Sequence, residues 1–108
     1  MNWNIITSVE DLDKIDQLST SNPVLIFKHS TRCPTSSMAL SRVERNWNDS
    51  TPTPFFLDLI AHRDVSSAIA EKYHVEHQSP QALLIKDKTC TFNASHLNIS
   101  LNEIEEQC

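Results

Sequence analysis

The chain has 108 residues, and its nine lysines and arginines against fourteen aspartates and glutamates give a formal net charge of −5. This acidic balance argues against nucleic acid as a main partner, because phosphate binding needs a basic face. No apolar stretch approaches the roughly 20 residues of a membrane span, and the polar start is not a signal peptide, so we expect no membrane partner and a cytoplasmic location. We expect one globular domain, residues 1–108, that needs no disulfide to fold.

The first elements that the sequence predicts are a short strand and a helix. Residues 5–7 predict the strand, and Ser8 is expected to open the helix as its cap. Leu12, Ile15 and Leu18 give this helix one apolar stripe, so we expect all three side chains to face the core.

The sequence is organised around a strand that delivers a cysteine to the start of a helix. Val24–Phe27 is a short run of β-branched, aliphatic and aromatic residues, which is typical of a buried central strand. Pro34 suits the first position of a helix, because its φ is fixed near the helical value and its missing N–H would be unpaired there anyway. Cys33 is then the N-cap, where unpaired backbone N–H groups and the helix dipole favour a thiolate, the reactive form of cysteine.

The helix after Cys33 is expected to run to about Trp47. Its inner face is formed by apolar residues at helical spacing: Ala39, Leu40, Val43 and Trp47. Residues 48–54 predict a loop, and Phe55–Ile60 predict a third strand. The nearly continuous apolar character of this strand is typical of parallel strands that are covered on both faces.

The second half of the chain predicts a helix, a hairpin and a last helix. Asp64 is expected to cap a helix that runs through Tyr73, with Val65, Ile69 and Ala70 or Tyr73 pointing inward.

The predicted hairpin joins Ala82–Ile85 to Thr89–Ala94 through a two-residue turn, Asp87-Lys88. Ser100 opens the last helix, which carries Leu101 and Ile104. The resulting order is β-α-β-α-β-α-β-β-α, which predicts an α/β fold with helices on both faces of one sheet.

The residues near Cys33 limit the chemistry that is expected. A dithiol oxidoreductase needs a second cysteine three residues on, and the chain has Ser36 there, whose hydroxyl cannot form a disulfide. The mechanism is therefore monothiol, or it recruits Cys90 or Cys108. Cys90 is expected to be packed in a strand or exposed on it, and Cys108 to be mobile and incidental.

Two further features leave alternatives open. Arg32 either is a solvated surface charge or stabilises a thiolate or a substrate carboxylate. His74 and His77 have a ligand-like spacing, but without a paired cysteine motif we expect no metal site and read both as surface residues. We interpret His29 and His96 as structural or as polar groups near the site.

Four segments together resemble the monothiol bacilliredoxins, YtxJ-like proteins of the bacillithiol system. They are His-Ser-Thr-Arg-Cys-Pro-Thr-Ser at residues 29–36, Arg-Asp-Val-Ser at 63–66, His-Gln-Ser-Pro-Gln-Ala at 77–82 and Ser-His at 95–96. The resemblance covers most of the chain and implies a thioredoxin-like fold with a mixed sheet. Family members remove bacillithiol, a low-molecular-weight thiol, from protein mixed disulfides.

The resemblance implies a role for each residue of the site. Cys33 falls on the nucleophile, Pro34 on the helix-start proline, Ser36 on the resolving position and Pro80 on the cis-proline. Without its own N–H, this proline lets the loop present the backbone of Ser79 to an extended substrate strand. We therefore expect Cys33 to be catalytic, and the substrate to be bound by Arg32, Pro34, Ser36, Ser79 and Pro80.

The expected partners are the small thiol, as a co-substrate and not as a bound cofactor, and S-thiolated client proteins. Three other functions stay open: reduction with glutathione, a non-catalytic thioredoxin-like binding module, and an iron-sulfur carrier of the monothiol glutaredoxin kind. The carrier normally has glycine after the cysteine, where this chain has Pro34. The sequence does not predict the oligomeric state.

Overall fold

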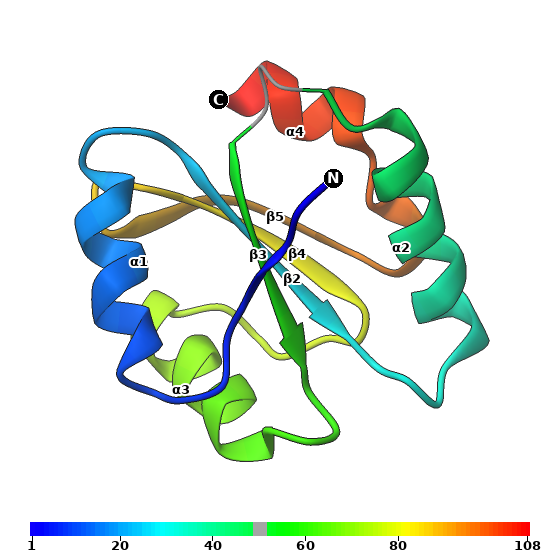
Figure 1. The fold of residues 1–108 in the computed structure, drawn as a ribbon, viewed down its shortest axis with the longest axis horizontal. Coiled ribbons are helices and arrows are strands. Elements are labelled where there is room, and N and C mark those ends of the chain that lie inside the picture. The colour runs from blue at the N-terminus through cyan, green and yellow to red at the C-terminus, as the bar shows by residue number, and fades with distance from the viewer. Residues whose placement is uncertain (49–51) are drawn as a thin grey trace.

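The computed structural model of the protein describes residues 1–48 and 52–108, so part of the predicted loop at residues 48–54 lies outside the described residues. The described chain alternates strands and helices in the predicted order (Figure 1). The strands are β1 Asn4–Ile5, β2 Val24–His29, β3 Thr53–Asp58, β4 Gln81–Lys86 and β5 Thr89–Ser95. The helices are α1 Asp11–Ser19, α2 Pro34–Asn46, α3 Arg63–Tyr73 and α4 Leu101–Gln107, with a 3-10 turn at His96–Asn98 before α4.

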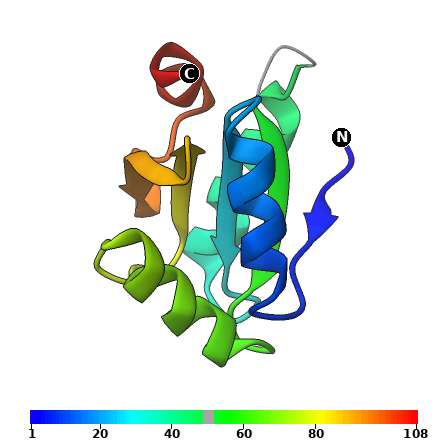
Figure 2. The same cartoon turned by 90° about the vertical axis from the view of Figure 1, so that its left-hand side faces the viewer.

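The strands form one mixed sheet in the order β1-β3-β2-β4-β5, which Figure 2 shows from β5 on the left to β1 on the right. Strand β2 pairs with β3 in parallel and with β4 antiparallel, so it lies at the centre of the sheet. All six residues of β2 are buried. The apolar run predicted this burial, because a strand covered on both faces has no polar alternation.

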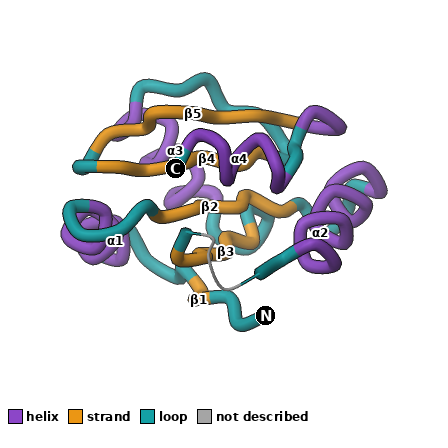
Figure 3. Tube along the Cα trace, turned by 90° about the horizontal axis from the view of Figure 1, so that it is seen from above, coloured by secondary structure: helices purple, strands orange, loops and turns teal. Residues whose placement is uncertain are grey.

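Helices cover both faces of the sheet, as predicted. Figure 3, which looks from above, places α1 and α2 on opposite sides of the strands. One core lies between the sheet and helices α1 and α3, and contains Leu12, Ile15, Val65, Ile69 and Tyr73. The other core lies on the opposite face under α2 and α4, and contains Ala39, Val43, Ile99 and Ile104. No helix of the described residues is long and apolar enough to cross a membrane.

Two predicted helix caps are wrong. Helix α1 begins at Asp11, and its N-cap is Glu10 and not Ser8. The Asp11 carboxylate accepts the backbone N–H groups of Thr7 and Ser8 at 2.9 and 3.2 Å. The N-cap of α3 is His62, and Asp64 lies in the first turn of that helix. The observed caps thus precede or follow the predicted ones by two residues. Ser100 caps α4 as predicted.

The apolar stripe of α1 also differs from the prediction. Leu12 and Ile15 are buried, but Leu18 is 41% exposed and the small Ser19 is buried in its place. Ser19 follows Ile15 by four residues and Leu12 by seven, so it lies on the same face of the helix as both. Leu18 follows Leu12 by six residues and therefore points away from that face. The Ser19 hydroxyl donates to the carbonyl of Asp16 and accepts the backbone N–H of Lys88, so burial of this polar side chain is compensated.

Strand β3 is shifted relative to the prediction and ends at Asp58 instead of Ile60. The Asp58 carboxylate accepts the backbone N–H groups of Ile60 and Ala61, both at 3.1 Å. An aspartate that bonds the backbone two and three residues ahead forms a turn. This turn ends the strand and leads into α3.

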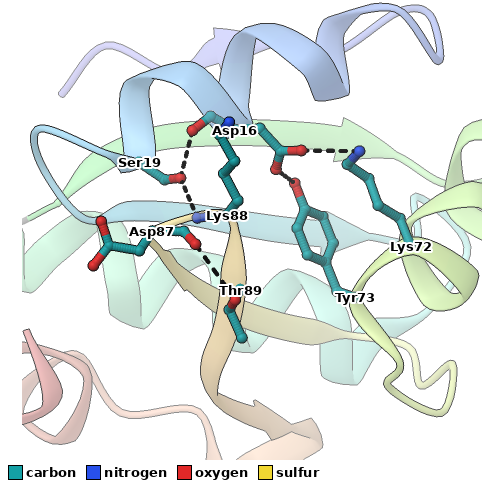
Figure 4. A network of polar contacts seen from close by, with 7 residues as sticks. All are labelled: Asp16, Ser19, Lys72, Tyr73, Asp87, Lys88 and Thr89. Carbon is teal, nitrogen blue, oxygen red and sulfur yellow. Dashed lines mark hydrogen bonds and ion pairs between the residues drawn. The ribbon is translucent and has the colours of Figure 1, made fainter.

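A polar network joins α1 to α3 and to the β4–β5 turn (Figure 4). The Asp16 carboxylate accepts the Tyr73 hydroxyl at 2.7 Å and pairs with Lys72 at 2.9 Å. The hairpin turn at Asp87 and Lys88 has two left-handed residues, with φ of 50° and 66°, where glycine or asparagine is common. Two bonds from Ser19 hold this turn: its carbonyl accepts the Asp87 N–H at 2.9 Å, and its hydroxyl accepts that of Lys88 at 2.8 Å.

Candidate active site

Cys33 lies where the sequence predicts it, at the N-cap of α2. Its backbone is extended, with φ −113° and ψ 116°, and Pro34 starts the helix. The Cys33 N–H donates to the carbonyl of Ser30 at 3.2 Å, and the Cys33 carbonyl accepts the N–H of Ser37 at 3.1 Å. Its side chain makes no capping hydrogen bond, and the residue is half-buried beside the unpaired N–H groups of a helix start.

Ser36 lies beneath this turn. Its side chain is 0% exposed, so its hydroxyl is turned toward the protein, and the expected contact of Ser36 with substrate stays a prediction that this burial does not favour. The Ser36 hydroxyl oxygen accepts the N–H of Ser30 at 2.9 Å and lies 2.7 Å from Nδ1 of His29. Burial was foreseeable, because residue 36 shares the inner helix face with Ala39 and Val43.

The pair of His29 and Ser36 connects the end of β2 to the first turn of α2. Burial lowers the pKa of His29, partly opposed by Asp58 and Glu44, and this favours a neutral ring. The Nδ1 atom of a neutral ring can accept the Ser36 hydroxyl proton while the Ser36 oxygen accepts the N–H of Ser30. The bonds fix the turn that carries Cys33.

The loop before β4 leaves the same end of the sheet as the loop that carries Cys33 (Figure 1). The peptide bond between Ser79 and Pro80 is cis, as predicted. The carbonyl of Pro80 accepts the N–H of His96 at 3.0 Å, which attaches the loop to the end of β5. Arg32 and Pro34, on either side of Cys33, are both exposed to solvent.

Sequence reasoning missed a buried lysine in the central strand. Lys28 is 0% exposed, and its Nζ lies 3.3 Å from the carbonyl of Ser66 and 3.0 Å from Nδ1 of His77. Burial lowers the pKa of Lys28 to about 8. Its only sequence signal is that a lysine continues an apolar strand. His77 is exposed, as expected, but it also belongs to this contact.

The other two cysteines lie at the far end of the sheet. Cys90 pairs with Ile85, which pairs with Val24 at the start of β2, whereas Cys33 follows the end of that strand. The 6 residues of β2 are separated by five steps of about 3.3 Å, which place the ends of the strand about 16 Å apart, and a disulfide needs Cα atoms within about 7 Å. Cys108 lies at the same far end, because its carbonyl accepts the Lys86 ammonium at 3.1 Å.

Both distant thiols are less reactive in these surroundings. The Cys90 thiol donates to the carbonyl of Phe92 at 3.3 Å, and burial raises its pKa. Burial also raises the pKa of Cys108. Among the described residues, no group of three or more histidine, cysteine, aspartate or glutamate side chains is arranged to hold a metal ion.

A cysteine at the helix start that follows the central strand, in a sheet of this order, is the arrangement of the thioredoxin fold. Comparison with protein families narrows the class. The family model described as monothiol bacilliredoxin BrxC matches residues 4–104. The chain therefore belongs to the monothiol bacilliredoxin family.

Solved structures support the same fold. A protein with a thioredoxin fold, provisionally described as an oxidoreductase, is 25% identical with a TM-score of 0.78, over 95% of this chain and 90% of that one. Thioredoxin from Fasciola hepatica is 17% identical with a TM-score of 0.72, over 95% and 93% of the two chains. Oxidised thioredoxin from Plasmodium falciparum is 16% identical with a TM-score of 0.71, over 98% and 97%. The two thioredoxins, at these identities, show the fold alone.

Proposed function

We propose that the protein is a monothiol thiol-disulfide oxidoreductase that removes bacillithiol from protein mixed disulfides, with Cys33 as its nucleophile. The observation that carries this proposal is the isolation of Cys33. It is half-buried at a helix start with no side-chain capping bond, while position 36 holds a buried serine and both other cysteines lie at the far end of the sheet. Membership of the monothiol bacilliredoxin family supports the choice of small thiol.

The reaction has two exchange steps. The Cys33 thiolate attacks the bacillithiol sulfur of the mixed disulfide, a Cys33–bacillithiol disulfide forms, and the client cysteine leaves as a thiolate that takes a proton from water. The thiolate of a second bacillithiol then attacks the bacillithiol sulfur on Cys33. This step forms bacillithiol disulfide and returns the Cys33 thiolate. The client cysteine is reduced and one free bacillithiol is oxidised, and the disulfide product joins that bacillithiol to the one taken from the client.

The neighbours of Cys33 have proposed roles in these steps. The exposed guanidinium of Arg32 either stabilises the thiolate or pairs with a carboxylate of bacillithiol. Pro34 keeps the helix start in place, and the backbone of Ser79 beside Pro80 pairs with an extended client segment. The clients in this proposal are S-thiolated cytoplasmic proteins, and the small thiol is a co-substrate that does not stay bound.

The test compares the wild type with Cys33→Ser and with the double variant Cys90→Ser/Cys108→Ser. A client protein with bacillithiol attached by a mixed disulfide, and the same client with glutathione attached, are each incubated with the enzyme and the matching free thiol. The masses of the client and of the enzyme are then measured by mass spectrometry. We expect the wild type and the double variant to release bacillithiol equally, Cys33→Ser to release none, and trapped enzyme to carry one bacillithiol on Cys33.

Three outcomes would contradict the proposal. A dominant disulfide between Cys33 and Cys90 or Cys108, with activity lost in the double variant, would show that a distant cysteine resolves the intermediate. Faster release of glutathione than of bacillithiol would assign the other thiol. Binding of clients without any release would indicate a non-catalytic module.

A further inference from the structure

Two buried polar side chains reach the loop before β4 from neighbouring strands. Lys28 in β2 and Gln81 in β4 are directly opposite each other in the antiparallel pairing, so their side chains leave the same face of the sheet. Lys28 is 0% and Gln81 1% exposed. Buried polar groups of this size are uncommon in strands, so their contacts indicate what they do.

Lys28 holds His77. The ammonium has no acceptor atom, so Nδ1 of His77 at 3.0 Å accepts from it and the proton of the neutral ring is on Nε2. Lys28 also donates to the carbonyl of Ser66 in α3, at 3.3 Å. In the described part of the chain, no carboxylate lies within ion-pair distance of Lys28.

Gln81 holds the residues on either side of His77. Its Nε2 donates to the carbonyl of Glu76 at 3.0 Å, and its Oε1 accepts the N–H of Gln78 at 3.4 Å. Three consecutive loop residues are thus fastened to the two strands, and Ser79 and Pro80 come next. The loop position is set immediately before the peptide that faces the Cys33 end of the sheet.

The choice of lysine at position 28 does not serve stability. A buried ammonium without a counter-ion is destabilising, and an apolar side chain of similar length would avoid that cost. Residues that cost stability are commonly retained for function. The contacts of Lys28 indicate that this function is to hold the loop before β4 in position.

We propose that Lys28 and Gln81 are positioning residues that set the place of Ser79 relative to Cys33, and that they favour extended protein disulfides over small-molecule disulfides as substrates. This inference rests on the proposed function. An extended client segment uses the Ser79 backbone, whereas a small disulfide needs little beyond the Cys33 sulfur. Loosening the loop therefore affects the two substrates unequally.

Lys28→Met is a suitable probe, because it keeps an unbranched side chain and removes only the ammonium. The partners keep other bonds: the Ser66 carbonyl lies inside α3, and the Ser66 hydroxyl lies 3.3 Å from Nδ1 of His77 and can donate to it. In the same way, Gln81→Met removes the amide that bonds Glu76 and Gln78 and keeps an unbranched side chain. Lys86→Met is the matched control, since Lys86 also donates to carbonyls but at the far end of the sheet.

The experiment measures two rates for the wild type, Lys28→Met, Gln81→Met, their double variant and Lys86→Met. One is kcat/KM on a peptide with an internal bacillithiol mixed disulfide, and the other is the rate at which bacillithiol disulfide modifies Cys33, followed by mass. We expect each single variant to lose about tenfold on the peptide, the double variant to lose more, and the small disulfide to change less than about twofold. Lys86→Met should match the wild type on both.

A second measurement checks the contact without activity. The ring nitrogens of His77, observed by NMR, should report a proton on Nε2 in the wild type, and Lys28→Met should raise the pKa of His77, which burial and the nearby Lys28 charge now lower. An unchanged His77 signal would overturn the inference. Equal losses on both substrates, or none, would also overturn it while the proposed function stands. A wild type that processes neither substrate would contradict the proposed function itself, and with it this role.

Discussion

Replacing Lys28 by methionine should raise the free energy of unfolding at pH 7, unlike most changes in a core. Burial lowers the pKa of Lys28 from 10.5 to about 8. At about 1.4 kcal/mol for each unit, the wild type loses about 3 kcal/mol by burying this charge. The variant also gives up two hydrogen bonds, each worth about 0.5–1.5 kcal/mol. The expected net gain is therefore about 0–2 kcal/mol, or up to several degrees in Tm.

The dependence on pH identifies the cause of this gain. Between the folded value near 8 and the ordinary value of 10.5, the unfolded chain binds more protons at Lys28 than the folded one does. Wild-type stability from this group therefore rises as the pH rises from 8 to 10.5, and is lost as the pH falls back to 8. The methionine variant lacks this slope, so its advantage should be constant below about pH 8 and should shrink above it.

Urea unfolding of both proteins at pH 7, 8, 9 and 10 measures this difference, because every other titrating group is common to both. Lys86→Met serves as the control and should follow the wild type at each pH. A variant that is less stable than the wild type at pH 7, or a difference that does not vary between pH 8 and 10, would refute the reasoning. Lys28 would then be partly hydrated or paired in solution.

Three other predictions concern single contacts. Tyr73→Phe should lower the free energy of unfolding by about 1–2 kcal/mol in urea titrations, because it removes the 2.7 Å bond to Asp16. Ser36→Ala should lower it by about 1–3 kcal/mol, because it leaves buried partners of the hydroxyl unpaired. Iodoacetamide at pH 7 should label Cys33 before Cys90, whose pKa is raised by burial, when peptides are quantified by mass spectrometry.

Each of the two stability predictions has a control within the chain. Lys72→Met removes the partly exposed ion pair to the same Asp16 and should change stability by less than about 1 kcal/mol. Ser41→Ala, at an exposed position of α2, should change it by less than about 0.5 kcal/mol. Losses as large in the controls as in the test variants would contradict the assigned contacts, and so would labelling of Cys90 first.

The junction of β2, Cys33 and α2 could be predicted because its signals are local. An apolar run, a proline and a polar stretch specify a strand, a helix start and the turn between them within about a dozen residues. The wrong caps at Ser8 and Asp64 show the limit of local signals. More than one residue could cap each helix, and the hydrogen bonds of the folded chain decide between them.

The long-range side-chain contacts, such as the one between Lys28 and His77, could not be predicted in the same way. Lys28 and His77 are 49 residues apart, and their contact depends on how α3 and the loop pack on the sheet. A lysine is almost never fully buried, so the sequence alone favours an exposed side chain at that position. The bond between Tyr73 and Asp16 spans 57 residues and was missed for the same reason.

Ser36 combines two requirements that sequence reasoning treats separately. In the sequence, the absence of a thiol at this position predicts only a feature of the chemistry, namely that no internal disulfide between residues 33 and 36 can release the substrate. In the structure the same hydroxyl accepts from the Ser30 backbone and bonds His29, so it also fixes the turn that carries Cys33. A thiol is a weak donor and acceptor and would make these bonds poorly. In the proposed mechanism, a serine here therefore both keeps the reaction dependent on an external thiol and holds the turn, so we expect its replacement to change the geometry of the site together with the mechanism.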